Sequence, residues 1–535
     1  MLTPQESYCI ACVLQGKPLP EIADVSATWR GLLANASKGG TEGQKALQKS
    51  LSYLLDGDSL KQVMSADTDA PPPAPPPRPV RAADAFIAVP PLPKGVALTA
   101  AQEKAAGRVG EFERRYTHWA SRVANESPIS FQQSSAFALL AAAIGRRVYI
   151  ATPWQQKVYV NQYILQLAVT TYNRKSTGLN ITRTIIDEAF PHLLMPRPGS
   201  TENFGNMLAG KWETDGLPQE DKEELERARP FAGQRVIIRD EISGLFRSFG
   251  RDHMAGLKED LMDMYECPNR HRLSTNSKGI VIARNIAPTL IGASTPVGMA
   301  LACSQTDWED GNLARFALVT PEEPYEDRPA PPEIYPATEF IDFLRDLHKR
   351  LPFPQIAALG QSPQAEEWSL VAPIWDEVRA YASTLREFTN PNRTDSLDNR
   401  LRGTYGRHHV KAIKIALALA TADWHASGTK DERPTVTKAH WYRAQSIAED
   451  WRASAHRFLH QTTLSEDADA AKRVRTYIAQ APLGITMSDL INATRLKAGL
   501  IKQSVEILME SGQVEAFKER RGGRGPEATC YRLIN

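Results

Sequence analysis

The spacing of apolar residues divides the chain into segments that favour different secondary structures. Short apolar runs, typical of buried strands, occur at 158–170, 234–240, 285–294 and 314–321, and the residues between them have helical spacing. Strands that alternate with helices favour a mostly parallel sheet that is covered by helices. We therefore expect residues 99–335 to form an α/β domain.

The segments on either side of this domain have helical periodicity. Residues 336–465 include EFIDFLRDLHKRL and HHVKAIKIALALATADW, and they predict an all-α lid or bundle that ends at an acidic joint, 464–471. Residues 1–66 predict a small helical domain, in which the segment QKALQKSLSYLLDG ends at Gly57.

Residues 67–98 are rich in proline, with the run APPPAPPPRP at their centre. Proline has no backbone N–H to donate and favours an extended polyproline II conformation. We interpret this segment as a semi-rigid linker between domains. A peptide ligand for a proline-binding partner is the less favoured alternative.

The last segment, 472–535, predicts three helices followed by a strand, a basic glycine-rich turn and a second strand. Thr486 is expected to cap the second helix. This is the order of a winged helix-turn-helix, in which the second helix of the pair enters the major groove of DNA. A winged helix that contacts proteins, or a merely solvated hairpin, is the alternative.

The predicted DNA-binding residues lie on the recognition helix and on the turn, or wing. Cationic side chains at both places suit contacts to phosphates or to the minor groove. The helix offers Lys497, Lys502 and Gln503, and the wing offers Lys518, Arg520, Arg521 and Arg524.

Composition narrows the class of protein without identifying a partner. Hydrophobic residues make up 42%, charged residues 24%, and the formal net charge is +2, so nucleic acid is neither required nor excluded. No apolar run is long enough for a membrane span, and the start has no signal-peptide pattern. Five cysteines do not form a disulfide framework, and a cytoplasmic protein is expected. The lone pair Cys9 and Cys12 favours a helix core over zinc.

Candidate nucleotide chemistry begins in TTYNRKSTGLN, residues 170–180, between a predicted strand and a predicted helix. A phosphate-binding loop places a lysine on the β- and γ-phosphates and a hydroxyl on Mg²⁺, at a helix N-terminus. The candidate residues are Arg174, Lys175, Ser176 and Thr177. Val169 and Arg174 occupy the positions where such loops carry glycine, so the loop is either reshaped or inactive.

Three later motifs fit the same chemistry. The strand in RVIIRDEISGLF ends in Asp240 and Glu241, residue types that hold Mg²⁺ and polarise the attacking water. The strand in PTLIGASTP ends in Ser294 and Thr295, either of which could sense the γ-phosphate. Each motif alone is also typical of an ordinary turn, and the prediction depends on their combined order.

Arg315, in DGNLARFALVTP, is the candidate arginine finger, a residue that reaches the γ-phosphate of a neighbouring subunit. Arg402 and Arg407 in the helical region are alternative candidates. The competing interpretation of Arg315 is an ordinary surface arginine without a catalytic role.

On these motifs, residues from about 110 to 455 resemble a family of phage-, plasmid- and prophage-borne P-loop proteins. The family is described as primase/helicase-like ATPases related to AAA+ proteins and superfamily III helicases. The pieces that carry the resemblance include RKST, DEISGLF, HMAGLKEDLMDMYECP, LIGASTP and GNLARF. The resemblance implies a P-loop NTPase fold with ATP and Mg²⁺ as cofactors. Its implied roles are phosphate and Mg²⁺ binding for Lys175 and Ser176, Mg²⁺ and water for Asp240 and Glu241, sensing for Ser294 or Thr295, and the finger for Arg315.

Our main hypothesis is an ATP-dependent DNA helicase or DNA-remodelling motor of a mobile genetic element, acting in replication. It would bind single-stranded or duplex DNA and form a homo-oligomer, for which a hexameric ring is one arrangement, and its N-terminal domain would contact a replication protein. The alternative is a nucleotide-gated or ATPase-dead DNA-binding scaffold that recruits a replicative helicase. A defence or plasmid-maintenance ATPase is a third option.

Overall fold

The computed structural model divides the chain into two compact units, Met1–Ala85 and Phe86–Asn535. It describes residues 4–15, 17, 27–54, 63, 89–154, 156–168, 175–275, 279–303, 305–322, 336–354, 367–392, 397–429, 433–481, 484–510, 513–519 and 528–534. In the first unit, α1 (Pro4–Leu14), α2 (Ala27–Lys38) and α3 (Gly40–Leu54) pack around Ile10, Leu33 and Leu51. Most of the predicted linker, 67–88, lies outside the described residues.

A four-stranded parallel sheet forms the centre of the second unit. Its order is β4 (Val236–Arg239), β7 (Thr289–Ser294), β3 (Tyr163–Leu167) and β8 (Ala317–Val319). Each strand lies within one of the apolar runs, because strands buried on both faces carry apolar side chains in both directions. The prediction of a mixed α/β fold with a parallel sheet is confirmed.

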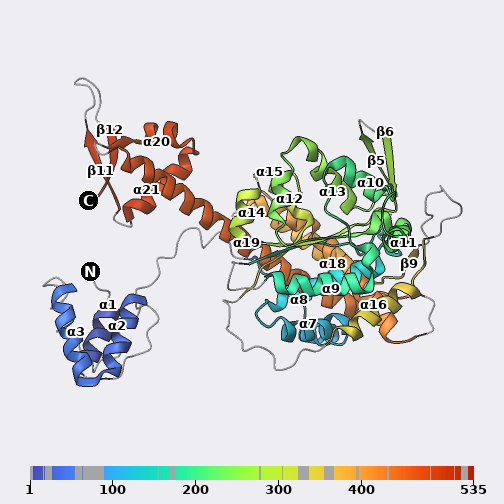
Figure 1. Cartoon of the computed structure of the whole chain (residues 1–535), viewed down its shortest axis with the longest axis horizontal. Coiled ribbons are helices and arrows are strands. Elements are labelled where there is room, and N and C mark those ends of the chain that lie inside the picture. Colours follow the sequence, from blue (N-terminus) through green and yellow to red (C-terminus); the bar gives the residue numbers. More distant parts are fainter. Residues whose placement is uncertain are drawn as a thin grey trace. The chain divides into compact units, whose positions relative to one another are not determined.

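Helices cover both faces of this sheet. Figure 1 shows α8 (Ile129–Ile144) and α9 (Lys175–Ala189) on one side, and α12 (Ser243–Ser248) and α13 (Leu257–Tyr265) on the other. Buried Gln166, in the middle of β3, donates to the carbonyl oxygen of Phe131 at 3.0 Å and to the hydroxyl of Ser134 at 3.0 Å. These bonds give the buried amide nitrogen of Gln166 its acceptors and link β3 to α8.

Smaller elements surround this centre. A second sheet has the order β2 (Lys157–Val158), β1 (Val148–Ala151) and β9 (Trp368–Leu370), and β5 (Arg270–Thr275) and β6 (Gly279–Arg284) form a projecting hairpin (Figure 1). The sequence analysis expected neither β1, β9 nor the hairpin. The helices and 3₁₀ turns around them are α6 (Ala100–Ala106), α7 (Glu111–Val123), η1 (Pro191–Leu193), α10 (Thr201–Leu208), α11 (Gln219–Ala228), η2 (Arg229–Gln234), η3 (Asp252–Met254), α14 (Pro296–Ala302), α15 (Gln305–Glu309) and η4 (Leu313–Arg315).

The region expected to form a lid contains α16 (Thr338–Arg350), α17 (Trp375–Phe388), α18 (Asn399–Ala426) and the long α19 (Lys438–Ala479). Their buried residues belong to the same hydrophobic core as the sheet, so these helices and the sheet share one packed interior. The helix α19 continues through 464–471, where an acidic joint was expected. Within the described ranges, every helix is too short or too polar to serve as a membrane span.

The end of the chain has its own small core. Val474 and Ile478 of α19 pack there with α20 (Met487–Thr494) and α21 (Ala498–Glu510). An antiparallel sheet of order β10 (Ile485–Thr486), β12 (Ala528–Leu533) and β11 (Val514–Glu519) completes it. The hydroxyl of Thr486 accepts from the backbone N–H of Asp489 at 3.2 Å, which confirms the predicted cap.

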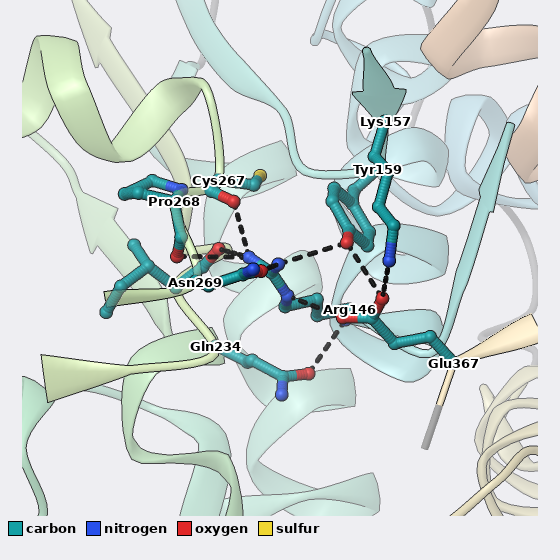
Figure 2. A network of polar contacts seen from close by, with 9 residues as sticks. Arg146, Lys157, Tyr159, Gln234, Cys267, Pro268, Asn269 and Glu367 are labelled. Atoms are coloured by element: carbon teal, nitrogen blue, oxygen red, sulfur yellow. Dashed lines mark hydrogen bonds and ion pairs between the residues drawn. The ribbon is translucent and has the colours of Figure 1, made fainter. Parts of the chain in front are cut away.

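Buried Arg146, just after α8, joins several distant segments of the core (Figure 2). Its guanidinium group pairs with the carboxylate of Glu367 at 2.8 Å and donates to the hydroxyl of Tyr159 at 3.0 Å. It also donates to the carbonyl oxygens of Cys267 and of Ile286. Since arginine stays charged, all of these acceptors are needed to offset the loss of water.

Two lysines of α18 are also buried against the sheet. Lys411 donates through its ammonium group to the carbonyl oxygen of Phe316 at 2.5 Å, and Lys414 donates to the side-chain oxygen of Asn161 at 2.7 Å. Burial, with Arg407 nearby, lowers the pKa of Lys411 to about 7, and burial lowers the pKa of Lys414 to about 8. Loss of water is the larger cause in both cases.

We predict that these lysines make the free energy of unfolding depend on pH in the alkaline range. Between pH 7 and 10.5, the folded and ordinary pKa values of Lys411, the unfolded chain binds more protons, so the free energy of unfolding rises with pH. The rise is at most about 1.4 kcal/mol per pH unit for each lysine. Lys411→Met should therefore flatten the pH dependence measured by urea unfolding at pH 7 to 9. Lys349→Met, on the exposed side of α16, is the control, and equal slopes in both variants would contradict the prediction.

Candidate ATP site at the carboxyl edge of the sheet

The carboxyl ends of β3, β4 and β7 meet at one edge of the sheet, because these strands are parallel and adjacent. Lys175 begins α9 after β3, Asp240 and Glu241 follow β4, and Ser294 ends β7. In open α/β sheets, ligands bind in the crevice at this edge. The topology thus brings together residues that are far apart in sequence.

Glu241 and Ser294 are in direct contact. The Ser294 hydroxyl donates to Oε1 of Glu241 at 2.5 Å, and the backbone N–H of Ser243 donates to the same oxygen at 3.3 Å. Burial alone would raise the pKa of the carboxyl group, but the hydrogen bonds from Ser243 and Ser294, with the charge of Lys175, hold it below the ordinary value. Glu241 is therefore ionised and oriented at neutral pH.

Lys175 lies beside this carboxylate. Its ammonium group donates to the carbonyl oxygen of Ala168 at 3.0 Å, just beyond the end of β3. Burial lowers the pKa of Lys175, and the charge of Glu241 partly opposes the shift. A phosphate bound at the same place would give the ammonium group a negatively charged partner.

Ser176 and Thr177 are exposed in the first turn of α9. The backbone N–H groups of a first helical turn have no partner within the helix, and they favour anions. Arg174 and the rest of the predicted loop, 169–174, lie outside the described residues.

Asp240 is held by a different cation. Its Oδ1 pairs with the guanidinium group of Arg183, on α9, at 3.2 Å, and the two side chains are 52% and 42% exposed respectively. An ion pair this exposed contributes about 0–1 kcal/mol. Mg²⁺ could displace Arg183 from the carboxylate at little cost, so Asp240 can serve as the metal ligand that the sequence predicts, whereas Ser176 is placed only as an exposed residue of the first turn of α9.

The two candidate sensor residues have different contacts. Ser294 bonds to Glu241, whereas the Thr295 hydroxyl accepts from the backbone N–H of Gly298 at 2.8 Å and caps α14. Of the two candidates, Ser294 is therefore the one that bonds to Glu241.

Arg315 lies away from these residues, at the opposite edge of the same sheet. It ends η4 before β8, where Ala317 pairs with Ile164 near the start of β3. Its Nε lies 4.0 Å from Glu266, and Arg407 approaches the same carboxylate at 3.9 Å. Burial, followed by the charge of Arg407, lowers the pKa of Arg315. The third candidate, Arg402, is half-buried on α18.

The candidate DNA-binding residues of the last segment are partly described. Lys502 and Gln503 are exposed on α21, whose opposite face buries Ile501 and Val505. Lys497 precedes this helix and Lys518 lies on β11, and both are exposed. Arg520, Arg521 and Arg524 lie outside the described residues.

The sequence analysis missed two residues that shape the site. Arg183 binds Asp240, but no local pattern links two positions on different elements. Gly292 is a glycine inside an apolar strand, a signal of close backbone approach. A Cβ at Gly292 would lie 2.7 Å from the Cβ of Ile242 and 3.0 Å from the carbonyl oxygen of Arg239. The loop that carries Glu241 is thus seated directly on β7, where the N–H of Ile242 donates to the carbonyl oxygen of Ala293 at 2.9 Å.

We predict that Gly292→Ala destabilises the fold by about 1–3 kcal/mol, the usual effect of overpacking. The new methyl group would push Ile242, and with it Glu241, away from β7. Urea unfolding measures the loss. Gly244→Ala is the matched control, since a Cβ there meets no atom within 4 Å. Equal stability of the two variants would show that the loop is not seated on β7.

Comparison with known proteins does not assign the chain to a family. No protein-family model matches it, and no characterised protein matches its sequence significantly. The function therefore has to be inferred from the side chains at the carboxyl edge of the sheet and from the features around them.

Proposed function

We propose that this protein is an ATP-dependent DNA helicase or DNA-remodelling motor, with its ATP site at the carboxyl edge of the sheet. One observation carries the proposal: three separate strand ends bring Lys175, Glu241 and Ser294 to the same edge of the sheet, where Ser294 bonds to the carboxylate of Glu241 and the charge of Lys175 helps to keep that carboxylate ionised. A lysine, an oriented carboxylate and a polar sensor are the parts that phosphoryl transfer to water requires.

Each residue then has a defined task. Lys175 binds the β- and γ-phosphates of ATP, and the Ser176 hydroxyl and the Asp240 carboxylate hold Mg²⁺. Bound Mg²⁺ neutralises charge that develops on the phosphates. Glu241 accepts a proton from the attacking water, and Ser294 fixes the orientation of its carboxylate.

The strand order supports the same proposal. The strand that ends in Ser294, β7, lies between β3, which leads to Lys175, and β4, which leads to Glu241. This order places the three candidate strand ends next to one another at one edge of the sheet. A parallel bridge between Leu194 and Val236 continues the sheet on the outer side of β4.

The end of the chain supports DNA as the partner. Helix, short strand, two helices and an antiparallel hairpin follow one another in the order of a winged helix. The exposed face of α21 carries Lys502 and Gln503, and the hairpin leads into the basic turn of the sequence. Cationic residues on a helix and on a wing favour phosphate contacts on both sides of a groove.

We further propose assembly into a ring, in which Arg315 acts on the site of a neighbouring subunit, because it lies at the opposite edge of the sheet from Lys175. The Arg315 side chain is 11% exposed and donates to the carbonyl oxygen of Gly311 at 2.9 Å, so it would have to turn outward to reach that subunit. Contacts between two different surfaces of identical subunits are heterologous, and they close into a ring when the rotation allows.

The scaffold alternative also has support from the site. Asp240 is already paired with Arg183, and the phosphate loop lacks glycine at the usual positions. A protein that binds ATP without hydrolysing it would use the same fold as a nucleotide-dependent DNA-binding scaffold.

We predict that Glu241→Gln reduces ATP turnover by at least about a hundredfold, because general-base groups contribute about 10²–10⁴ to rates. ATP binding should persist in this variant, since the amide keeps the shape of the side chain. Lys175→Ala should lose both binding and turnover. Phosphate release with and without DNA, and binding of a fluorescent ATP analogue, measure the two effects.

Glu220→Gln, on the exposed face of α11, is the control for this pair. Full turnover in Glu241→Gln would refute the ATP site. Nucleotide binding without turnover in the unaltered protein would instead favour the scaffold.

We predict that the basic wing contributes phosphate contacts to DNA binding. Each contact adds about 0.9 to the slope of log affinity against log salt concentration on duplex DNA. Replacing Arg520, Arg521 and Arg524 with Gln should therefore lower the magnitude of the slope by up to about 2.7. Fluorescence anisotropy at several salt concentrations measures it.

The matched control removes three cationic charges elsewhere, by Lys104→Gln, Lys349→Gln and Arg379→Gln. The control should leave the salt slope unchanged. An unchanged slope in the wing variant would place the DNA-binding surface on another part of the chain.

A further inference from the structure

A cleft of about 560 Å³ opens at the carboxyl end of β4, and it shares Asp240 and Glu241 with the candidate ATP site. Its walls come from α9, from the segment between η1 and α10, and from the residues around α12 and η3. The arginines that line it are Arg183, Arg197, Arg239 and Arg251, and His253 lies among them. Asp240 and Glu241 are the only two carboxylates in its lining, so arginines outnumber acids.

The positive charge in the cleft is only partly balanced. Arg183 pairs with Asp240 at 3.2 Å, whereas Arg197 and Arg251 form no ion pair or side-chain hydrogen bond with the residues that the structure describes. Burial lowers the pKa of Arg239, and the charges of Arg197 and Arg183 lower it further. The charges of Arg183 and Arg197 therefore both act on Arg239, and an anion bound among these groups would relieve the repulsion.

The shape and the chemistry of the cleft indicate the anion. Guanidinium groups match phosphate oxygens with two parallel hydrogen bonds, and several of them in a concave site favour phosphate over a single carboxylate. The cleft is of the size of a small-ligand site, too narrow for a duplex. Buried Ile238 and Met254 supply an apolar floor for the organic part of a ligand.

We propose that this arginine cleft binds phosphate groups in addition to those of the hydrolysed nucleotide. Their source is either the backbone of single-stranded nucleic acid or a free polyphosphate. Both present closely spaced phosphates to Arg197, Arg239 and Arg251, and both can be bound without ATP.

Arg183 links this cleft to the candidate ATP site. A phosphate in the cleft competes with Asp240 for the Arg183 guanidinium, and the released carboxylate is free to hold Mg²⁺. Since coupling between two sites is reciprocal, Mg²⁺ and ATP should strengthen phosphate binding in the cleft. This last step rests on the proposed ATP site, but phosphate binding itself does not.

The test measures binding by the full-length chain without nucleotide. The probes are a short fluorescent oligothymidylate and, as a competitor, tripolyphosphate. Every protein carries Lys502→Gln and Lys518→Gln, which weaken the DNA contacts of the last segment. Adding Arg197→Gln and Arg251→Gln should reduce affinity at least tenfold, whereas adding Arg379→Gln, on α17, should change it less than twofold.

The outcomes separate the two phosphate sources. Cleft-dependent binding of the oligonucleotide that tripolyphosphate displaces only weakly identifies nucleic acid, and tight binding of tripolyphosphate identifies a free polyphosphate. Unchanged affinity for both probes in a folded Arg197→Gln, Arg251→Gln variant would overturn the proposal. A chain that never hydrolyses ATP but loses binding in this variant would refute the proposed function and leave the cleft established.

Discussion

Transfer of the Arg146 guanidinium out of water is the constraint on which the rest of the core depends. An isolated buried charge would cost several kcal/mol, so the acceptors around it must be in place together. They come from Tyr159, Glu367, the turn after α13 and the residue Ile286 before β7 (Figure 2). The base of the β5–β6 hairpin and the start of β7 are thereby fixed against α8 by one side chain.

The charged residues of the candidate ATP site differ from Arg146 in how firmly their partners hold them. Each guanidinium nitrogen of Arg146 has an acceptor within the core. At the carboxyl edge of the sheet, by contrast, several charged side chains have partners that a ligand could replace. Lys175 bonds a strand-end carbonyl, and Asp240 pairs with an exposed arginine. Only the Glu241–Ser294 contact is short and partly buried. A rigid core with exchangeable partners at one edge suits a site whose ligand arrives highly charged and leaves.

The sequence predicted the parts of the structure that depend on local pattern. Apolar runs marked the four strands of the sheet, and Thr486 capped the helix expected of it. Local sequence pattern failed to predict strands whose partner strands are distant in the sequence. The strand β9 exists because Trp368 pairs with Val148, more than two hundred residues away, and the three residues of β9, WSL, are too few to mark a strand by themselves.

The residues of the candidate site also fall into those that local motifs predicted and those that they did not. Lys175, Glu241 and Ser294 were predicted from motifs at strand ends, because parallel strands bring such ends together. The Arg183–Asp240 pair and the arginine cleft could not be predicted, since they join residues from elements whose relative rotation is set by packing alone. Acidic residues 464–471 suggested a joint, but helical propensity carried α19 through them.

The separation of Lys175 and Arg315 on opposite edges of one sheet has a consequence for inheritance. If the finger acts between subunits, each working site is assembled from two chains, and no chain carries a complete one. Two alleles damaged at opposite edges would then complement each other within a mixed assembly, since some interfaces would pair two intact halves. Two alleles damaged at the same edge would not.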